Sequence, residues 1–184
     1  MNSKILVIGH GYSVLDSERG KEIDRFPGAI VRLNHYKIEG FEKHVGTRTD
    51  IYQSGGKFHL KNAQKNYIIV LVYHTTKCND YLNAFKKANS KNIVIEIPFL
   101  EVEELKKELG CSDVAYATSG MMALYSFMIR GFDVYAYGFD FYRFNRGLDY
   151  YRNDGGRYNC CCHEPQKENF YFDKLCEQGR IKRF

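Results

Sequence analysis

Three short segments of the chain place groups that could bind an anion where a strand or helix pattern ends or begins. Gly9-His10-Gly11 follows a short apolar run, and glycines at such a turn let a phosphate or nucleotide approach the backbone closely. Asn34 follows a second apolar run, where its amide could bind a ribose hydroxyl or a phosphate oxygen. Thr118-Ser119-Gly120 precedes an apolar helical pattern, and hydroxyl and backbone N–H groups at a helix N-terminus favour negative charge. Taken singly, each segment is also explained by a plain turn or a helix cap.

Later segments carry further candidates. His163 stands at the start of a helical pattern with Glu168 five residues beyond it, and a histidine there can take a proton from an alcohol near neutral pH. A surface histidine is the structural alternative. Gly138-Phe139-Asp140 ends a strand pattern in a glycine turn, and Asp149-Tyr150 lies within residues 141–162. That stretch has no periodicity, and an ordered loop of its length is often functional.

Alternating strand and helix patterns must position these candidates. Six short apolar runs, mostly β-branched or aromatic, predict strands buried on both faces of a parallel sheet: 5–8, 29–33, 50–53, 67–73, 92–97 and 133–137. Apolar residues at helical spacing predict helices over 80–88, 100–109, 119–130 and 164–178. This order predicts an α/β fold with a mostly parallel sheet and helices on both faces, in which ligands bind at the carboxyl ends of the strands.

Length and composition bound the class of protein. The 184 residues, 44% of them hydrophobic and 27% charged, predict a single globular domain over residues 1–184. The net charge of +5 favours anionic partners. No apolar run approaches the roughly 18 residues of a membrane span, and the short apolar run after the N-terminus does not resemble a signal peptide. We therefore expect a cytoplasmic protein, in which residues 179–184 form a frayed polar end with at most peripheral contact to an anionic membrane.

The cysteines predict free thiols rather than disulfides or a metal site. Without a secretion signal, their even number does not indicate a disulfide framework. Cys160-Cys161-Cys162 next to His163 suggests metal ligands, but adjacent residues cannot easily all turn onto one ion, and no Cys-x-x-Cys pair exists. The remaining cysteines are Cys78, Cys111 and Cys176.

The glycine turn lacks the features of a dinucleotide-binding site. That fingerprint needs a third glycine where the chain has Val14, and an acidic residue at the end of the second strand, which instead runs into Asn34. A nicotinamide-dependent oxidoreductase is therefore disfavoured.

In order and spacing, the candidate segments resemble the sialyl motifs of the animal-type sialyltransferases, glycosyltransferase family 29. The long motif is resembled by Gly9-His10-Gly11, Gly20, residues 31–34 and residues 45–49. The small motif is resembled by residues 117–121 and 134–139, the third (His-Tyr-Tyr) by Asp149-Tyr150-Tyr151, and the very small (His-x4-Glu) by His163 with Glu168.

The resemblance implies a Rossmann-like variant of the GT-A fold and an inverting, metal-independent transfer of sialic acid from CMP-sialic acid to a glycan or glycolipid. No cofactor is implied, and the chain has no Asp-x-Asp motif of metal-dependent transferases. His163 would be the general base. The donor would be bound by residues of all the motifs: Gly9, His10, Gly11, Asn34, Thr118, Ser119, Gly120, Gly138, Phe139, Asp140, Asp149 and Tyr150.

Two positions depart from the family pattern. The family has Asn where this chain has His10, and the third motif begins with His, which contacts the leaving phosphate, where this chain has Asp149. A carboxylate beside a phosphate is unfavourable, so a basic neighbour such as Arg143, Arg146 or Arg152 is a candidate for that contact. The departures leave open a different acidic donor such as CMP-Kdo, or a module that binds a nucleotide or glycan without turnover. A nucleic-acid-binding domain ranks last, because the aromatic residues fall mostly in predicted core segments.

Overall fold

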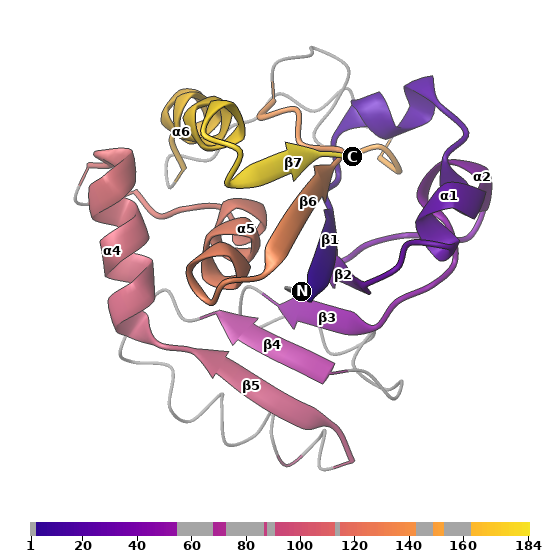
Figure 1. Cartoon of the computed structure of the whole chain (residues 1–184), viewed down its shortest axis with the longest axis horizontal. Coiled ribbons are helices and arrows are strands. Elements are labelled where there is room, and N and C mark those ends of the chain that lie inside the picture. Colours follow the sequence, from indigo (N-terminus) through magenta and orange to yellow (C-terminus); the bar gives the residue numbers. More distant parts are fainter. Residues whose placement is uncertain are drawn as a thin grey trace.

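Parallel strands form one sheet through the middle of the protein (Figure 1). The computed structural model describes residues 3–54, 68–72, 87, 91–112, 115–142, 149–152 and 163–184. The strands within them are Lys4–Ile8 (β1), Ala29–Leu33 (β2), Ile51–Ser54 (β3), Ile68–Val72 (β4), Ile93–Ile97 (β5), Asp133–Tyr137 (β6) and Ile181–Arg183 (β7). They lie in the order β5-β4-β3-β2-β1-β6-β7, and every neighbouring pair is parallel.

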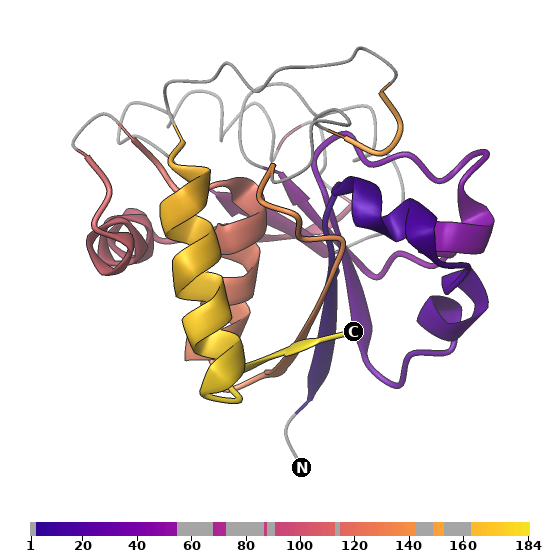
Figure 2. The ribbon, with the colours of Figure 1, turned by 90° about the horizontal axis from the view of Figure 1, so that it is seen from above.

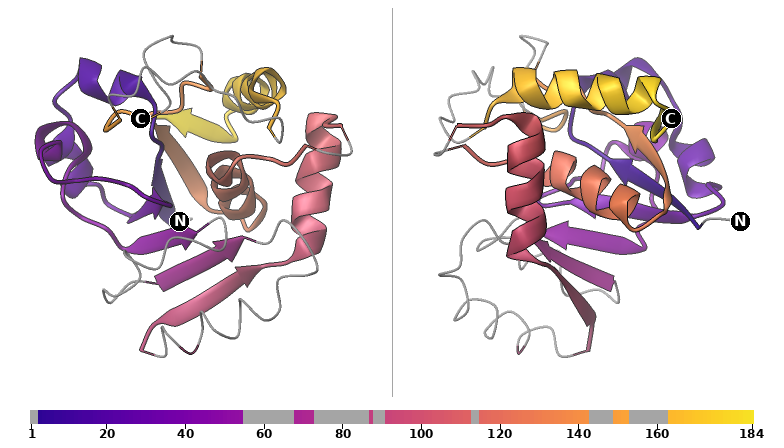
Figure 3. Two further views of the ribbon diagram at one scale, coloured as in Figure 1. Left: turned by 180° about the vertical axis from the view of Figure 1, so that it is seen from behind. Right: turned by 60° about the vertical axis from the view of Figure 1, so that its left-hand side comes forward.

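Helices cover both faces of the sheet. Figure 2 shows the sheet between two groups, and Figure 3 shows the larger group from two further sides. The larger group is α4 (Phe99–Leu109), α5 (Ser119–Ile129) and α6 (Pro165–Glu177). The other is the short 3₁₀ helix η1 (Tyr12–Asp16) with α1 (Gly20–Asp24) and α2 (Glu42–Val45). None of the described helices is long and apolar enough to span a bilayer.

Each face of the sheet has its own apolar core. Successive side chains of a strand point to opposite faces, so Val7 and Val31 pack with the α4–α6 group while Leu6 and Ile30 pack with the η1–α2 group. Burial on both faces explains why these strands are continuous apolar runs. Residues 121–128 of α5 are all buried, and all of them except Ser126 are apolar.

The predicted α/β architecture is confirmed, with each of the six predicted strands ending within one residue of its prediction. The helices predicted over 100–109, 119–130 and 164–178 agree equally well, and the one predicted over 80–88 lies outside the described residues apart from residue 87. The expectation of a frayed end at residues 179–184 is wrong. Strand β7 pairs with β6, Ile181 is buried, and Phe184 packs into the second core.

Two of the cysteines lie within the described residues, and both are free thiols, as predicted. Burial raises the pKa of Cys111 to about 11 and also raises the pKa of Cys176. Neither thiol is therefore activated as a nucleophile at neutral pH.

The chain order reverses at β1, because β2 to β5 follow on one side of it and β6 lies on the other. In open parallel sheets, ligands bind at such a switch point. Here the turns after β1 and β6 touch: Gly9 N donates to Tyr137 O (2.7 Å) and Gly11 N to Gly138 O (2.8 Å). A Cβ atom at position 9 would overlap the carbonyl oxygen of Gly138, so only glycine fits there.

We expect Gly9→Ala to lower the free energy of unfolding by at least about 2 kcal/mol, because the added methyl meets rigid backbone between two central strands. Urea denaturation measures this loss. The matched control is Gly110→Ala at the end of α4, where φ is 62° and no atom lies within 4 Å of the added Cβ. Its expected loss is about 1 kcal/mol, from backbone conformation alone. Equal losses in the two variants would contradict the steric explanation.

Candidate functional site

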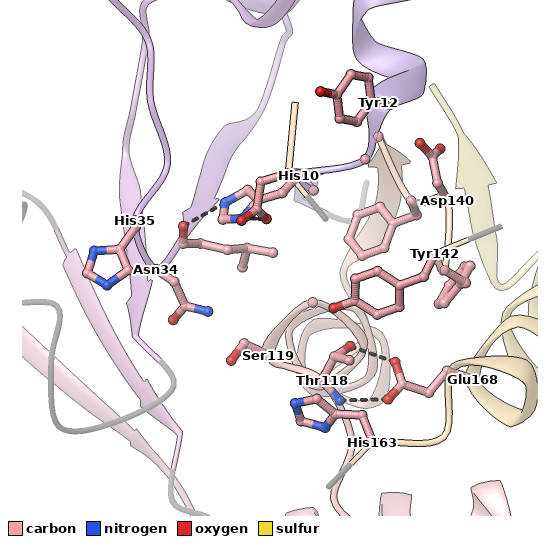
Figure 4. A pocket seen from close by; sticks show the side chains of 18 of the residues that line it. His10, Tyr12, Asn34, His35, Thr118, Ser119, Asp140, Tyr142, His163 and Glu168 are labelled. Carbon is pink, nitrogen blue, oxygen red and sulfur yellow. Dashed lines mark hydrogen bonds and ion pairs between the residues drawn. The ribbon is translucent and has the colours of Figure 1, made fainter. Parts of the chain in front are cut away.

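A pocket of about 300 Å³ lies at the carboxyl ends of β1, β2 and β6, beside the start of α5 (Figure 4). Its lining includes every predicted site residue except Tyr150: Gly9, His10, Gly11, Asn34, Thr118, Ser119, Gly120, Gly138, Phe139, Asp140, Asp149 and His163. The fold therefore brings segments that are far apart in the sequence onto one cavity.

The glycine turn after β1 packs against the turn after β6. The N–H groups of Gly9 and Gly11 already donate to carbonyl oxygens at the end of β6. A Cβ atom at position 11 would also overlap the carboxyl group of Asp140. These glycines allow two turns to pack together, and the geometry gives no support for a phosphate bound by their two N–H groups.

Asp140 is held by the start of η1. Its carboxylate accepts hydrogen bonds from the backbone N–H of Ser13 (2.8 Å) and from the Ser13 hydroxyl. It therefore fixes the turn after β1 against the turn after β6. The carboxylate lines the pocket, but its hydrogen bonds are structural.

His10 and Asp149, the two departures from the family pattern, contact one another. His10 Nδ1 lies 3.1 Å from Asp149 Oδ1, and His10 Nε2 lies 2.9 Å from the carbonyl oxygen of Leu33. Both ring nitrogens face acceptors, so both bonds form together only when the ring carries both protons. The second carboxylate oxygen of Asp149 accepts from Arg152 Nε at 2.9 Å. Asp149 is thus paired with the cationic side chain of Arg152 and lies in contact with the ring of His10.

The segment 149–152 is fixed to the turn after β1 by further contacts. The backbone N–H of Tyr150 donates to His10 O at 2.9 Å, and the Tyr12 hydroxyl donates to Arg152 O at 3.0 Å. Tyr150 itself is buried in the second core, and its hydroxyl donates to the carbonyl oxygen of Lys37. The predicted contact of Tyr150 with a donor is therefore not supported; its neighbours Tyr151 and Arg152 line the pocket instead.

Asn34 lies where the chain turns sharply after β2. Its φ of 45° is in the left-handed region, which asparagine tolerates better than most residues. Its backbone N–H donates to Gln53 O at 2.8 Å, at the end of the next strand. Asn34 and His35 form one side of the pocket, across from Tyr142 (Figure 4).

A buried carboxyl group joins the starts of α5 and α6. Glu168 is fully buried, and its two oxygens accept from the backbone N–H (2.7 Å) and the hydroxyl (2.6 Å) of Thr118. The same hydroxyl caps α5 by accepting from Met121 N at 3.2 Å. Because its hydroxyl is engaged on both sides, Thr118 supports the site rather than offering that group to a ligand. Burial raises the pKa of Glu168 to about 7, against the opposing effect of the two bonds from Thr118.

His163 lies just before α6, next to the start of α5 (Figure 4). Its Nδ1 lies 2.7 Å from the carbonyl oxygen of Tyr116. A carbonyl oxygen only accepts, so Nδ1 carries the proton and the neutral ring has its lone pair at Nε2. This tautomer suits a general base, because Nε2 is the basic nitrogen and the backbone fixes the ring.

Several lining residues were not among the predicted donor-binding residues, among them Tyr12, His35, Phe141, Tyr142 and Tyr151. Phe141 and Tyr142 have φ of 48° and 57°, a strained conformation for large side chains. Phe141 packs against Phe172 of α6 at 5.1 Å between ring centroids, which offsets part of that strain. Nothing in the local sequence signals this conformation. Tyr12 and His35, in contrast, adjoin predicted residues and were within reach of the sequence argument.

Metal ligation has no basis in the described part of the chain, where no group of three or more His, Cys, Asp or Glu side chains is placed to share an ion. The segment with Cys160-Cys161-Cys162 lies outside the described residues.

Comparison with known proteins gives a family and a fold. The sequence profile of glycosyltransferase family 29 (sialyltransferase) matches residues 3–96. No curated protein sequence matches the chain. Two crystal structures of a mammalian sialyltransferase, one in complex with Gal-beta-1-3GalNAc-ortho-nitrophenol, superpose with a TM-score of 0.72 and 17% identity. Each superposition covers 100% of this chain and 69% of the other. At that identity the likeness establishes the fold.

We expect Glu168→Gln to flatten the pH dependence of stability. Because the folded-state pKa of Glu168 is raised to about 7 from 4.5, the folded protein binds the proton more tightly than the unfolded chain. The contribution of this group to stability is therefore complete below about pH 4.5 and is lost as the pH rises through about 7. Between about pH 5 and pH 8, the free energy of unfolding of the unchanged protein should fall by roughly 2 kcal/mol more than that of Glu168→Gln. Urea denaturation at the two pH values measures both.

Glu177→Gln is the matched control, since it removes an exposed carboxylate from the end of the same helix. Its stability curve should run parallel to that of the unchanged protein. A Glu168→Gln curve that is also parallel would show that burial of this carboxylate does not control its protonation.

Proposed function

Because this chain belongs to glycosyltransferase family 29, the sialyltransferases, we propose that its pocket binds CMP-sialic acid and transfers the sugar to a hydroxyl group of a glycan. The observation that carries the proposal is the meeting of all four motif-like segments on one pocket at the switch point of the sheet. His10, Asn34, Ser119, Asp149 and His163 come from separate parts of the chain, and only the fold unites them.

The proposed reaction is a direct displacement at the anomeric carbon. The acceptor oxygen forms the new bond to that carbon while the bond from carbon to the phosphate oxygen breaks, and CMP leaves with the electron pair. The acceptor proton passes to Nε2 of His163, whose Nδ1 is fixed by Tyr116 O. Attack opposite the leaving phosphate inverts the anomeric configuration. The resemblance also implies that no metal takes part, so transfer should persist in EDTA.

Charge in the pocket suits an anionic donor. The donor carries a phosphate and a carboxylate, and the first turn of α5 offers backbone N–H groups at Ser119 and Gly120. Each of the carboxylates among the described lining residues is already held by protein donors: Asp140 by Ser13, Asp149 by His10 and Arg152, Glu168 by Thr118. Their hydrogen-bonding reduces repulsion of the donor.

The acceptor is proposed to be a glycan hydroxyl. The mammalian sialyltransferase of the same fold was crystallised with a Gal-beta-1-3GalNAc derivative, which supports a glycan acceptor here. The lining aromatic side chains Tyr12, Tyr142 and Tyr151 provide flat apolar surfaces on which a sugar ring can lie.

We expect CMP to raise the melting temperature more than UMP, AMP or GMP at matched concentration. A specific ligand at about 100 times its dissociation constant stabilises the folded state by roughly 2.7 kcal/mol. Differential scanning fluorimetry measures the shift. CMP-selective binding without transfer from CMP-sialic acid would indicate another CMP-sugar donor or a module without turnover. No shift with any nucleotide would overturn the proposal.

His163→Ala should lower the turnover number for sialyl transfer by about a hundredfold to ten-thousandfold, because the acceptor loses its base. The dissociation constant for CMP should stay nearly the same, since the base acts on the acceptor. A radiolabelled transfer assay and calorimetry measure the two quantities. His44→Asn is the control, because His44 lies outside the pocket and bonds Ser17 O on the other face of the sheet. Undiminished turnover in His163→Ala would remove His163 from the mechanism.

A further inference from the structure

One carboxylate organises the cationic wall of the pocket. Asp149 Oδ1 contacts His10 Nδ1 at 3.1 Å, and Asp149 Oδ2 accepts from Arg152 Nε at 2.9 Å. The three side chains come from two segments that are joined by a backbone hydrogen bond and by the bond from the Tyr12 hydroxyl to Arg152 O, so the cluster is fixed in place. Both nitrogens of His10 are engaged, by Asp149 and Leu33 O. Its ring nitrogens therefore both face protein acceptors and offer no hydrogen bond to a ligand.

Arg152 differs from His10 in what it can still offer. A guanidinium has five N–H groups; its Nε forms an ion pair with Asp149, and the side chain also shares a hydrogen bond with the Tyr151 hydroxyl. The side chain is about half exposed at 45%, lies against the ring of Tyr151 at 5.8 Å from its centroid, and lines the pocket. Its carbonyl oxygen is held by the Tyr12 hydroxyl at 3.0 Å. Arg152 is therefore fixed at its backbone and at Nε, and its half-exposed side chain lines the pocket.

Other groups expected to bind an anion on this side have structural partners. The N–H groups of Gly9 and Gly11 donate to carbonyl oxygens at the end of β6. A planar guanidinium held through Nε suits two parallel bonds to the oxygens of a phosphate or carboxylate. Among these groups of the described wall, Arg152 has the chemistry that the substrate needs.

We infer that Arg152 binds an anionic group of the sugar-nucleotide donor and that Asp149 is the positioning residue that aims it. This inference rests on the proposed function, since it names the contact for an anion of that donor. Phosphate and sugar carboxylate present the same kind of oxygen pair, and the experiments distinguish them. An acidic residue thus helps an anion to bind, because it orients the cationic side chain of Arg152.

Arg152→Gln tests the contact. Calorimetry with CMP, cytidine and CMP-sialic acid should show CMP affinity falling roughly tenfold or more while cytidine affinity is unchanged, if the phosphate is bound. A loss confined to CMP-sialic acid would assign the contact to the sugar carboxylate. Arg180→Gln, an exposed arginine outside the pocket, is the control for net charge and should change none of the three. Unchanged affinity of Arg152→Gln for all ligands would overturn the inference.

Asp149→Asn tests the positioning role through the sign of its effect. If Asp149 only repelled the donor, its removal would raise CMP affinity. We expect CMP affinity to fall instead, with cytidine affinity unchanged, and the double variant Asp149→Asn/Arg152→Gln to lose little more than Arg152→Gln alone. A gain in CMP affinity, or additive losses, would overturn the positioning role. Melting temperatures confirm that each variant folds. Arg152→Lys is a second test of the contact between Arg152 and the anion, and it leaves Asp149 unchanged.

The binding experiments distinguish failure of this inference from failure of the proposed function. If the unchanged protein binds no nucleotide, the proposed function fails. If it binds CMP and the Arg152 variants bind it equally well, the function stands and the assignment of Arg152 fails.

Discussion

Glu168 is fully buried and bonded through both oxygens to Thr118, and the geometry of the pocket depends on that contact. It fixes the start of α6 to the start of α5, so His163, which precedes α6, stands beside Ser119 and Gly120. A buried carboxyl group is costly unless its oxygens are bonded, and here the two donors of one residue satisfy it. The same hydroxyl also caps α5. The contact between Thr118 and Glu168 therefore caps α5, joins α5 to α6 and places the proposed base.

On the opposite side of the pocket, the two residues that depart from the family pattern contact one another. His10 and Asp149 each depart from the family pattern, and each would be difficult to explain alone. In the folded protein they contact one another, and Arg152 completes the cluster. Hydrogen bonds from Tyr150 N to His10 O and from the Tyr12 hydroxyl to Arg152 O hold the two segments together. The two departures are far apart in the sequence but lie at one place in the folded protein.

The strands and the longer helices could be predicted because they depend on local patterns, and most of the pocket lining because its segments resemble the sialyl motifs in order and spacing. Continuous apolar runs identify buried parallel strands, and the switch-point rule places their following turns together. The short elements η1, α1 and α2 lack enough turns for helical periodicity, and β7 is a strand only because β6 is there to pair with it. The burial of Tyr150 and the contact between His10 and Asp149 depend on tertiary structure, which no single segment encodes.

The position of β1 in the sheet has a consequence for how the chain folds. Residues 3–54 supply β1 to β3 and one side of the pocket, but β1 completes its pairing only when Ile5 meets Val134 on β6. Contacts so far apart in sequence close large loops and form late. During synthesis, β1 can pair with β6 only after most of the chain has left the ribosome. A chain released before β6 is made would lack the turn after β6, Arg152 and His163, and would therefore have no site.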